Sequence, residues 1–418
     1  MTPRHVVVVG SGVVGLSCAH YLLERGHRVT VVERGGPDRD NCSLGNAGYI
    51  SPSHVAPLPS PGIVKKALGW MGDPESPFYV RPRLDPAFLG WAWRFWRAAT
   101  PSWARRAGPV LRDLTNQSRE IYVAMAARAG NDFELTTEGL LNLVRTPQGL
   151  AEETRAAEQA RALGVPAEML DARGVAALEP DVRLDVIGGA LYPTDAHLTP
   201  QRFVATLERW VRDAGASFAW NAEILGWRHE GRAIRAARTA AGEIGADEFV
   251  LAAGSWTPRL ASPLGVSLPM EPGKGYSVTM PESPVRLRRS VLLHEARVAI
   301  TPMGRALRVG GTMELTGYDL SINPPRIRGI RKSLRRFLPE IRDDAFDGVK
   351  PWCGLRPCTP DGLPYIGRVG RYANLSVAAG HAMMGLSMAP ATGRLLAQIL
   401  SGEPPSVEPT LLHPDRYA

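Results

Sequence analysis

The sequence predicts an α/β fold arranged in two domains. Three observations support this expectation: the chain has 418 residues, its first strand runs into a glycine-rich turn and a helix, and the same order of strand, glycine and helix returns near the C-terminal end. A chain of this length exceeds one ordinary hydrophobic core. The composition, with 44% hydrophobic and 22% charged residues, is ordinary for a globular protein.

The first strand and turn form a dinucleotide-binding pattern. The four valines at 6–9 are typical of a parallel strand that is buried on both faces. Gly10, Gly12 and Gly15 follow with the spacing G-x-G-x-x-G, and a helix is expected over 16–25. In this pattern the first glycine permits the turn, the second lets the backbone approach a pyrophosphate, and the third lets the helix pack on the strand. A glycine-rich helix start in an unrelated sheet is the alternative.

A second strand over 28–32 ends in Glu33, where an acidic side chain can bind the ribose hydroxyls of an adenosine. The loop at 40–50 is rich in Ser, Asn and Gly, and such a loop lets backbone groups approach a ligand closely. Its position after the second strand favours a cofactor role, and a plain surface loop is the alternative.

The net charge of +8 comes mostly from arginines that are scattered and mixed with acids, so we interpret them as a solvated surface and expect no nucleic-acid partner. Cys18, Cys42, Cys353 and Cys358 show no C-x-x-C spacing, so we expect neither a metal site nor a disulfide framework. We find no signal peptide and no apolar run long enough to span a membrane, and we expect a cytoplasmic protein.

The segment 88–106 mixes Trp, Phe and Arg on a short helix over 88–97 and just beyond it. This composition suits a membrane interface, where aromatic rings sit at headgroup depth and arginines meet anionic lipid. The alternative, a second-domain core from which the arginines extend to solvent, is the favoured interpretation. A membrane interface would place the protein peripherally at the inner face of the cell membrane.

The other elements are expected in the following order. Residues 52–86 are expected to be irregular because they are dense in Pro and Gly. Helices are expected over 111–129, 152–163, 171–178, 201–214 (begun by Thr199 and Pro200) and 327–337. Strands are expected over 133–137, 140–144, 189–193, 248–253, 275–280, 298–302 and 307–312, with a small antiparallel meander from 217–220, 223–227 and 234–238.

The C-terminal region contains a second strand–glycine–helix junction. Residues 352–368 hold so many Gly and Pro residues that no regular structure is expected there. A strand over 374–380 then leads through His381 into an apolar helix over 386–400. The junction directs another helix N-terminus toward the cofactor. Two such junctions at opposite ends of the chain favour a large cofactor such as FAD over NAD.

Four motifs together resemble the D-amino-acid dehydrogenase/glycine oxidase family of FAD flavoproteins. They are the N-terminal glycine pattern, Ser43-x-x-Asn46-Ala47-Gly48, Gly354-Leu355-Arg356-Pro357 with Thr359-Pro360-Asp361-Gly362-Leu363-Pro364, and Ala379-Gly380-His381. The similarity covers nearly the whole chain, and the long C-terminal motif is its most specific part.

The resemblance implies a Rossmann-like FAD-binding domain and an inserted substrate domain built on a mixed sheet. We accordingly expect an FAD-binding domain over 1–84, 196–268 and 346–418, and a substrate domain over 85–195 and 269–345. Sarcosine-oxidase-like members attach the flavin through a cysteine whose position here is Gly354, with Cys353 next to it. We therefore expect FAD to be bound non-covalently.

By the same resemblance, Arg356 binds the substrate carboxylate, for which a guanidinium is a planar, bidentate and permanently charged partner. A structural ion pair is the alternative for Arg356. His381 is a candidate for a hydrogen bond to the flavin pyrimidine, with a satisfied helix-start histidine as the alternative. Tyr276 completes the catalytic candidates. Candidates for substrate preference are Tyr276, His294, Arg297 and Thr312.

The residues expected to bind the cofactor are Gly10, Gly12, Val13, Val14, Gly15, Glu33, Arg34, Ser43, Asn46, Ala47, Gly48, Ile224, Leu225, Gly254, Trp256, Gly354, Gly380, His381, Met384 and Gly385. Some family members carry a second polar residue after the Gly-His pair to hold the substrate. Met383 and Met384 stand there in this chain, which suggests an apolar or adaptable pocket or simple packing.

The resemblance implies oxidation of an α-amino acid by hydride transfer from Cα to flavin N5, giving an imino acid that water hydrolyses. We expect a small D-amino acid, or a related amino acid such as a hydroxyproline isomer, as substrate, and a quinone or carrier as electron acceptor. One alternative is a glycine/sarcosine-type oxidase that uses oxygen. Another is a non-catalytic, flavin-holding subunit of a complex.

Overall fold

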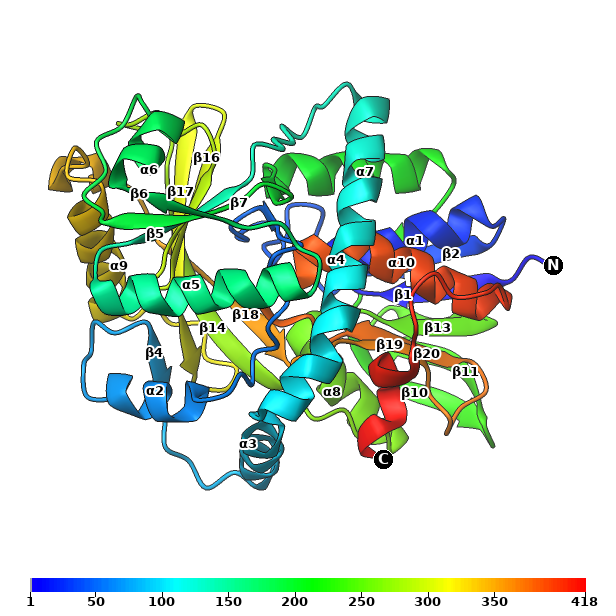
Figure 1. The fold of residues 1–418 in the computed structure, drawn as a ribbon. Helices are drawn as coiled ribbons and strands as arrows, with labels where there is room; N and C mark the ends of the chain where they lie inside the picture. The colour runs from blue at the N-terminus through cyan, green and yellow to red at the C-terminus, as the bar shows by residue number, and fades with distance from the viewer. Residues whose placement is uncertain (1) are drawn as a thin grey trace.

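The structure is a computed structural model that describes residues 2–418. Within this range the strands form a six-stranded and a nine-stranded sheet, together with a three-stranded and a two-stranded one. The nine-stranded sheet lies on the left of Figure 1 and the six-stranded sheet on the right, with the long helix α4 (Pro101–Ala129) in front of their junction. The expected α/β fold with two large sheets is confirmed.

The six-stranded sheet has the order β19-β20-β13-β1-β2-β9. Its strands are β1 (His5–Val9), β2 (Arg28–Val32), β9 (Ser217–Ala219), β13 (Glu248–Leu251), β19 (Tyr365–Arg368) and β20 (Leu375–Ala379). All neighbours are parallel except the edge strand β19. The C-terminal strand β20 pairs with β13, so the end of the chain completes the sheet as the second junction predicted.

Both faces of β1 are buried, as its run of valines predicted. Val6 and Val8 pack under α1 (Val13–Glu24), α4, α7 (Pro200–Asp213) and α10 (Gly385–Ser401). Val7 and Val9 pack under the small sheet of β10 (Ile224–Glu230), β11 (Ala233–Thr239) and β12 (Gly242–Gly245). The short helix α8 (Thr257–Ala261) follows β13.

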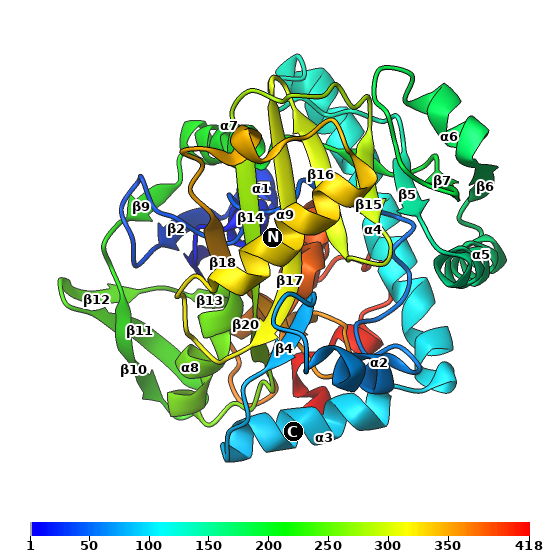
Figure 2. The ribbon, with the colours of Figure 1, turned by 90° about the vertical axis from the view of Figure 1, so that its left-hand side faces the viewer.

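The nine-stranded sheet is mixed, with the order β18-β14-β17-β16-β15-β5-β7-β6 and β4 paired to β17. Its strands are β4 (Phe78–Val80), β5 (Leu140–Val144), β6 (Glu168–Asp171), β7 (Gly188–Tyr192), β14 (Glu271–Met280), β15 (Ser290–Leu293), β16 (Val298–Met303), β17 (Ala306–Leu315) and β18 (Trp352–Cys358). The basic helix α9 (Pro324–Phe337) crosses its outer face (Figure 2).

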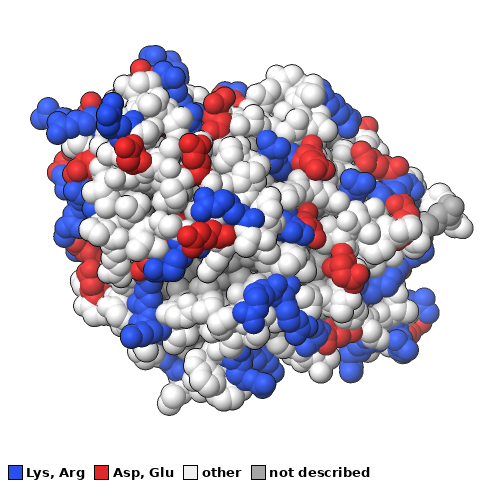
Figure 3. All heavy atoms as spheres, in the orientation of Figure 1, with Lys and Arg blue, Asp and Glu red and all other residues white. Residues whose placement is uncertain are grey.

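The remaining elements surround the space between the two large sheets. They are α2 (Ile63–Trp70), α3 (Pro86–Ala98), α5 (Pro147–Ala162), α6 (Ala172–Leu178) and the strand pair β3 (Tyr49–Ile50) and β8 (Ala196–His197). No helix within 2–418 has both the length and the apolar composition that crossing a membrane requires. Basic and acidic side chains alternate over the face seen in Figure 3, as the mixed charge pattern of the sequence predicted.

Two regions that were expected to be irregular contain regular structure. Residues 52–86 include α2 and β4, and residues 352–368 include β18 and β19. The prediction failed at β18 because glycine and proline serve particular purposes there: a Cβ at Gly354 would lie 2.2 Å from the Trp352 ring, and Pro357 stands in an edge strand, where proline is tolerated.

Three local predictions were wrong. Residues 133–137 form no strand and contribute only an isolated bridge from Thr136 to His197. The strand expected at 217–220 joins the large parallel sheet as β9 instead of the meander. Thr199 precedes α7 as expected, but its hydroxyl donates to Glu134 at 2.5 Å and makes no cap. In each case a partner distant in sequence replaced the local one.

The two large sheets depart from the expected domain ranges at two places. β4, within 1–84, and β18, within 346–418, both pair in the nine-stranded sheet. Sheet membership therefore assigns these two strands to the substrate side, whereas the five-part division as a whole stays a proposal.

Candidate cofactor and substrate site

A single large cavity of about 1600 Å³ connects the two sheets. It begins at the N-terminus of α1, continues past the loop at 41–47, and reaches Arg356 on β18. From there it extends to α2 and α3, where its lining is aromatic and aliphatic. Its walls come from the parallel sheet at one end and the mixed sheet at the other, which is the arrangement expected for a cofactor beside a substrate.

The N-terminal end of the cavity is shaped by the glycine pattern. Gly10 has φ of +106°, a conformation that favours glycine, and a Cβ at Gly15 would lie 1.9 Å from the Gly10 carbonyl oxygen. The N-terminus of α1 has no side-chain cap. The Val13 N–H donates to Ser43 Oγ at 3.0 Å, so a hydroxyl of the loop at 41–47 lies at this helix terminus. This end suits a phosphate.

The acidic residue after β2 lies beside this helix terminus. Glu33 Oε2 accepts hydrogen bonds from the Ser11 amide at 2.9 Å and from its hydroxyl at 2.7 Å. The Arg34 guanidinium stacks 3.8 Å above the Trp256 ring. Asn41 Nδ2 lines the cavity, is buried and has no partner among residues 2–418. An unpartnered buried donor, a helix N-terminus whose N-cap residue offers no side-chain acceptor, and a carboxylate together fit the pyrophosphate and ribose of FAD.

The mixed sheet holds the loop at 41–48 in place. Arg308 on β17 is buried, and its Nη1 donates to the carbonyls of Leu44 and Asn46, each at 2.8 Å. Burial lowers the pKa of Arg308 to about 10, so its charge is retained at neutral pH. Thr301 on β16 donates to the Ala47 carbonyl at 2.5 Å. The sequence offered one signal for Arg308, a lone arginine within an apolar strand, and we missed it.

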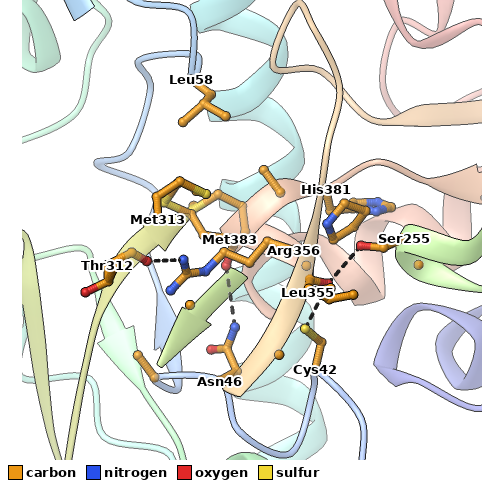
Figure 4. Close-up of a pocket in the computed structure, with 18 of the residues that line it drawn as sticks. Cys42, Asn46, Leu58, Ser255, Thr312, Met313, Leu355, Arg356, His381 and Met383 are labelled. Carbon is orange, nitrogen blue, oxygen red and sulfur yellow. Dashed lines mark hydrogen bonds between the residues drawn. The ribbon is translucent and has the colours of Figure 1, made fainter. Parts of the chain in front are cut away.

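Arg356 has no acidic partner. No carboxylate within 2–418 lies within 4.0 Å of its guanidinium, and its one recorded side-chain hydrogen bond runs from Nη1 to the Thr312 carbonyl at 2.5 Å. Burial lowers the pKa of Arg356 from its ordinary value. Met313 and Met383 lie beside it in Figure 4, and Leu58 is a further apolar residue of the cavity wall. The alternative of a structural ion pair is thus excluded, and the unpaired cation suits an anionic ligand.

Two other catalytic candidates, His381 and Tyr276, each make a side-chain hydrogen bond within the protein. His381 Nε2 pairs with Thr392 Oγ1 at 3.0 Å, and burial lowers the pKa of His381 to about 3. The Tyr276 hydroxyl donates to Glu314 at 2.5 Å, in a buried cluster that includes Arg326. Both side chains line the cavity. Their bonds favour a structural role, which for His381 is the alternative of a satisfied histidine at a helix start.

His381 gives a testable pH dependence. Because its folded-state pKa of about 3 lies below the ordinary 6.5, the unfolded chain binds the proton more tightly. Its contribution to stability is therefore present above pH 6.5 and is lost as the pH falls toward 3. When the pH falls from 7 to 5, the free energy of unfolding of the wild type should decrease by about 2 kcal/mol more than that of His381→Asn. Denaturant titrations at both pH values measure this; His229→Asn, at an exposed position, is the control.

Most of the expected site residues line the cavity. They are Gly10, Gly12, Val13, Val14, Glu33, Arg34, Ser43, Asn46, Ala47, Ile224, Gly254, Trp256, Tyr276, Gly354, Arg356, His381, Met384 and Gly385, together with the substrate candidates His294, Arg297 and Thr312. The structure thus brings together residues from both ends of the chain. The ring of His294, however, is hydrogen-bonded on both sides: Nδ1 lies 2.7 Å from Glu153 Oε2, and Nε2 lies 3.3 Å from Glu152 Oε2.

Four expected cofactor residues do not line the cavity. Gly15, Gly48 and Gly380 instead allow close packing: a Cβ at Gly48 would lie 2.3 Å from the Leu198 carbonyl oxygen, and one at Gly380 would lie 2.6 Å from Thr359 Cγ2. Leu225 is 67% exposed and lies at a β-bulge, where the register between β10 and β11 shifts between Ile224 and Gly226.

Other lining residues were missed. Trp352 donates from Nε1 to Asp40, and a Cβ at Gly45 would lie 2.3 Å from its ring. Cys42 donates to the Leu355 carbonyl at 3.0 Å. At the apolar end of the cavity, α3 matches the helix expected over 88–97, whereas α2 lies in the segment 52–86, for which no regular structure was expected. In the sequence, only Gly45 and Gly354, whose missing side chains leave room for Trp352 and Cys42, could have indicated these contacts.

Comparison with known proteins identifies the family. The DAO family, described as FAD dependent oxidoreductase, matches residues 5–399. The D-amino acid dehydrogenase of Granulibacter bethesdensis is 36% identical over 423 residues and that of Methylobacterium radiotolerans 37% over 428 residues. Each alignment covers 99% of this chain, and they cover 99% of the first relative and 100% of the second.

Solved structures share the fold. The glycine oxidase of Geobacillus kaustophilus aligns over 100% of both chains with a TM-score of 0.78 and 23% identity. The L-proline dehydrogenase of P. horikoshii aligns over 99% of this chain and 98% of its own, with a TM-score of 0.76 and 20% identity. These identities support the fold alone, whereas the family match confirms the expected FAD. The chain belongs to the DAO family of FAD-dependent oxidoreductases.

Proposed function

We propose that this enzyme oxidises a small D-amino acid, or a related amino acid such as a hydroxyproline isomer, to the imino acid that water then hydrolyses. The observation that carries the proposal is the unpaired Arg356 guanidinium at the far end of the cofactor cavity. The printed names of the relatives, D-amino acid dehydrogenase, support the same substrate class. We further propose that FAD is held non-covalently.

Bound FAD supplies the two-electron oxidation in this proposal. Arg356 binds the substrate carboxylate through its free N–H groups, which fixes one end of the amino acid. The apolar side chains of Met313 and Met383 reduce water around that contact and strengthen it. His381 stays neutral, so it adds no second cation that would compete for the carboxylate. A substrate that binds with a neutral amine needs no side chain of this chain as base.

We propose a quinone or carrier as electron acceptor and α3 as a peripheral membrane contact. Phe88 and Trp91 on α3 are buried, whereas Trp93 and Trp96 are 58% and 56% exposed. Trp96 also lines the apolar end of the cavity. Both interpretations of this segment therefore have support, since one face of the helix packs inward and the other leaves aromatic rings free. Exposed arginines follow at 105–106.

The membrane contact predicts lipid binding that depends on the exposed tryptophans. We expect the protein to co-sediment with vesicles of anionic phospholipid and the double variant Trp93→Ser/Trp96→Ser to lose about tenfold or more of that affinity, because each buried ring contributes about 1 kcal/mol or more. Ile187→Ser/Leu225→Ser removes two exposed apolar side chains elsewhere and is the control. Equal binding by all three proteins would contradict the contact.

The proposed function is tested by anaerobic flavin reduction. The purified protein is mixed with D- and L-amino acids, glycine, sarcosine and hydroxyproline isomers, and the flavin absorbance near ~450 nm is followed. We expect D-amino acids or a hydroxyproline isomer to bleach it, with slow recolouring in air and fast recolouring with a soluble quinone. Bleaching by glycine or sarcosine with fast recolouring in air would instead identify an oxidase. An intact flavin that nothing bleaches would indicate a non-catalytic flavin subunit.

A further inference from the structure

The side chain of Arg356 lies across β14 at a position where that strand has glycines, Gly273 and Gly275. Arg356 on β18 pairs with Gly273 of β14, and Gly275 lies two residues further along, on the same face. A Cβ at Gly275 would lie 2.2 Å from Arg356 Cζ, so the guanidinium rests directly on the Gly275 backbone. Its Nη1 then reaches the next strand, β17, at the Thr312 carbonyl. Any side chain at Gly275 would occupy the space of the guanidinium.

A β-bulge lies at the point on β17 that the guanidinium reaches. The register between β14 and β17 shifts at Gly275, which therefore faces two residues, Thr312 and Met313. Thr312 has φ of +68°, a left-handed conformation that a β-branched residue rarely adopts. A glycine would relieve this strain, and strained residues that persist beside a binding cavity are frequently part of its function.

We propose that Gly275 and the bulge at Thr312–Met313 are positioning residues that hold the Arg356 guanidinium ready for a carboxylate. Gly275 provides the surface on which it lies, the Thr312 carbonyl fixes Nη1, and Met313 stands beside it as an apolar neighbour (Figure 4). A long side chain that is fixed before the ligand arrives loses less freedom on binding. The proposal rests on the proposed role of Arg356 in binding the substrate carboxylate.

The first test is a double-mutant cycle between Gly275→Ala and Arg356→Ala. We expect Gly275→Ala alone to retain FAD and to raise KM for the amino acid at least tenfold, with a smaller change in kcat. In the Arg356→Ala background it should raise KM no further, because its effect acts through the guanidinium. Gly226→Ala on β10, where a Cβ meets nothing within 4 Å, is the matched glycine control.

The second test relaxes the bulge and covers the case in which Gly275→Ala fails to fold. Thr312→Gly should raise the melting temperature, because the strain is relieved, and should also raise KM several-fold, because a freer bulge holds the guanidinium less firmly. Asn131→Gly changes a residue with a similar φ of +56° that does not line the cavity, and it should leave KM unchanged.

The outcomes separate this inference from the proposed function. If Arg356→Ala leaves KM unchanged, the carboxylate contact itself is wrong. If Arg356→Ala raises KM, but Gly275→Ala has no effect or raises KM equally in both backgrounds, the positioning role is overturned and the contact stands. A more stable Thr312→Gly variant with an unchanged KM would likewise overturn the role of the bulge.

Discussion

Replacing Arg356 by alanine should lower kcat/KM for an amino acid by about 10²- to 10³-fold. The loss corresponds to about 3–4 kcal/mol, within the range for removing one member of a buried, hydrogen-bonded charge pair. Arg356→Lys keeps the charge but loses the planar, bidentate geometry, so we expect an intermediate loss of about tenfold. Steady-state kinetics with the substrate from the flavin-reduction panel measures both values.

Because Arg356 has no ionic partner among residues 2–418 of the free protein, its replacement tests the substrate contact without breaking an ion pair. Because no carboxylate contacts it in the free protein, its removal leaves no buried anion without a partner, and the melting temperature should be unchanged or higher. The amide of the same amino acid lacks the carboxylate, so its kcat/KM should hardly respond to Arg356→Ala. Equal losses for acid and amide, or a loss of bound FAD, would show that Arg356 acts in another way.

Replacing Gly15 by alanine should weaken FAD binding by about 5- to 150-fold or prevent folding. The new Cβ would lie 1.9 Å from the Gly10 carbonyl oxygen, and this atom is backbone that cannot rotate away. The helix α1 must therefore move off β1, and overpacking of this kind costs about 1–3 kcal/mol. The displaced helix carries the N–H groups that face the phosphate end of the cavity.

Titration of the apoprotein with FAD measures this effect, together with the ratio of flavin to protein absorbance after purification. Gly69→Ala is the matched control, because Gly69 is exposed on α2 and a Cβ there meets nothing within 4 Å. It should keep the wild-type FAD affinity. A Gly15→Ala protein with unchanged FAD affinity would show that the close approach of α1 to the turn is not needed.

The phosphate end of the cavity could be predicted from sequence because it is made of consecutive residues. The strand, the turn at Gly10 and the start of α1 follow one another in the chain, and each glycine answers a steric demand set by its neighbours in sequence. The second junction, from β20 to α10, was predictable for the same reason. Arg356 was identified through the long C-terminal motif around it.

The predictions failed where the relevant partner lies far away along the chain. The glycines and prolines at 352–368 indicated irregular structure, but Gly354 and Pro357 stand in the edge strand β18, where Gly354 leaves room for the Trp352 ring. Thr199 was expected to cap α7, but its hydroxyl donates to Glu134, 65 residues earlier in the chain. The strand at 217–220 was expected in the small meander, but it pairs with β2 in the six-stranded sheet.

The sequence by itself determined the α/β class and the FAD cofactor, and it indicated the first junction and Arg356 as the places where cofactor and carboxylate bind. Only the tertiary structure decided that this arginine has no acidic partner, that Gly275 leaves room for it and that a bulge at Thr312 fixes it. The physical reason is that steric demands of a turn act between neighbours, whereas the pairing of a charge and the register of two strands depend on residues that meet only when the chain has folded.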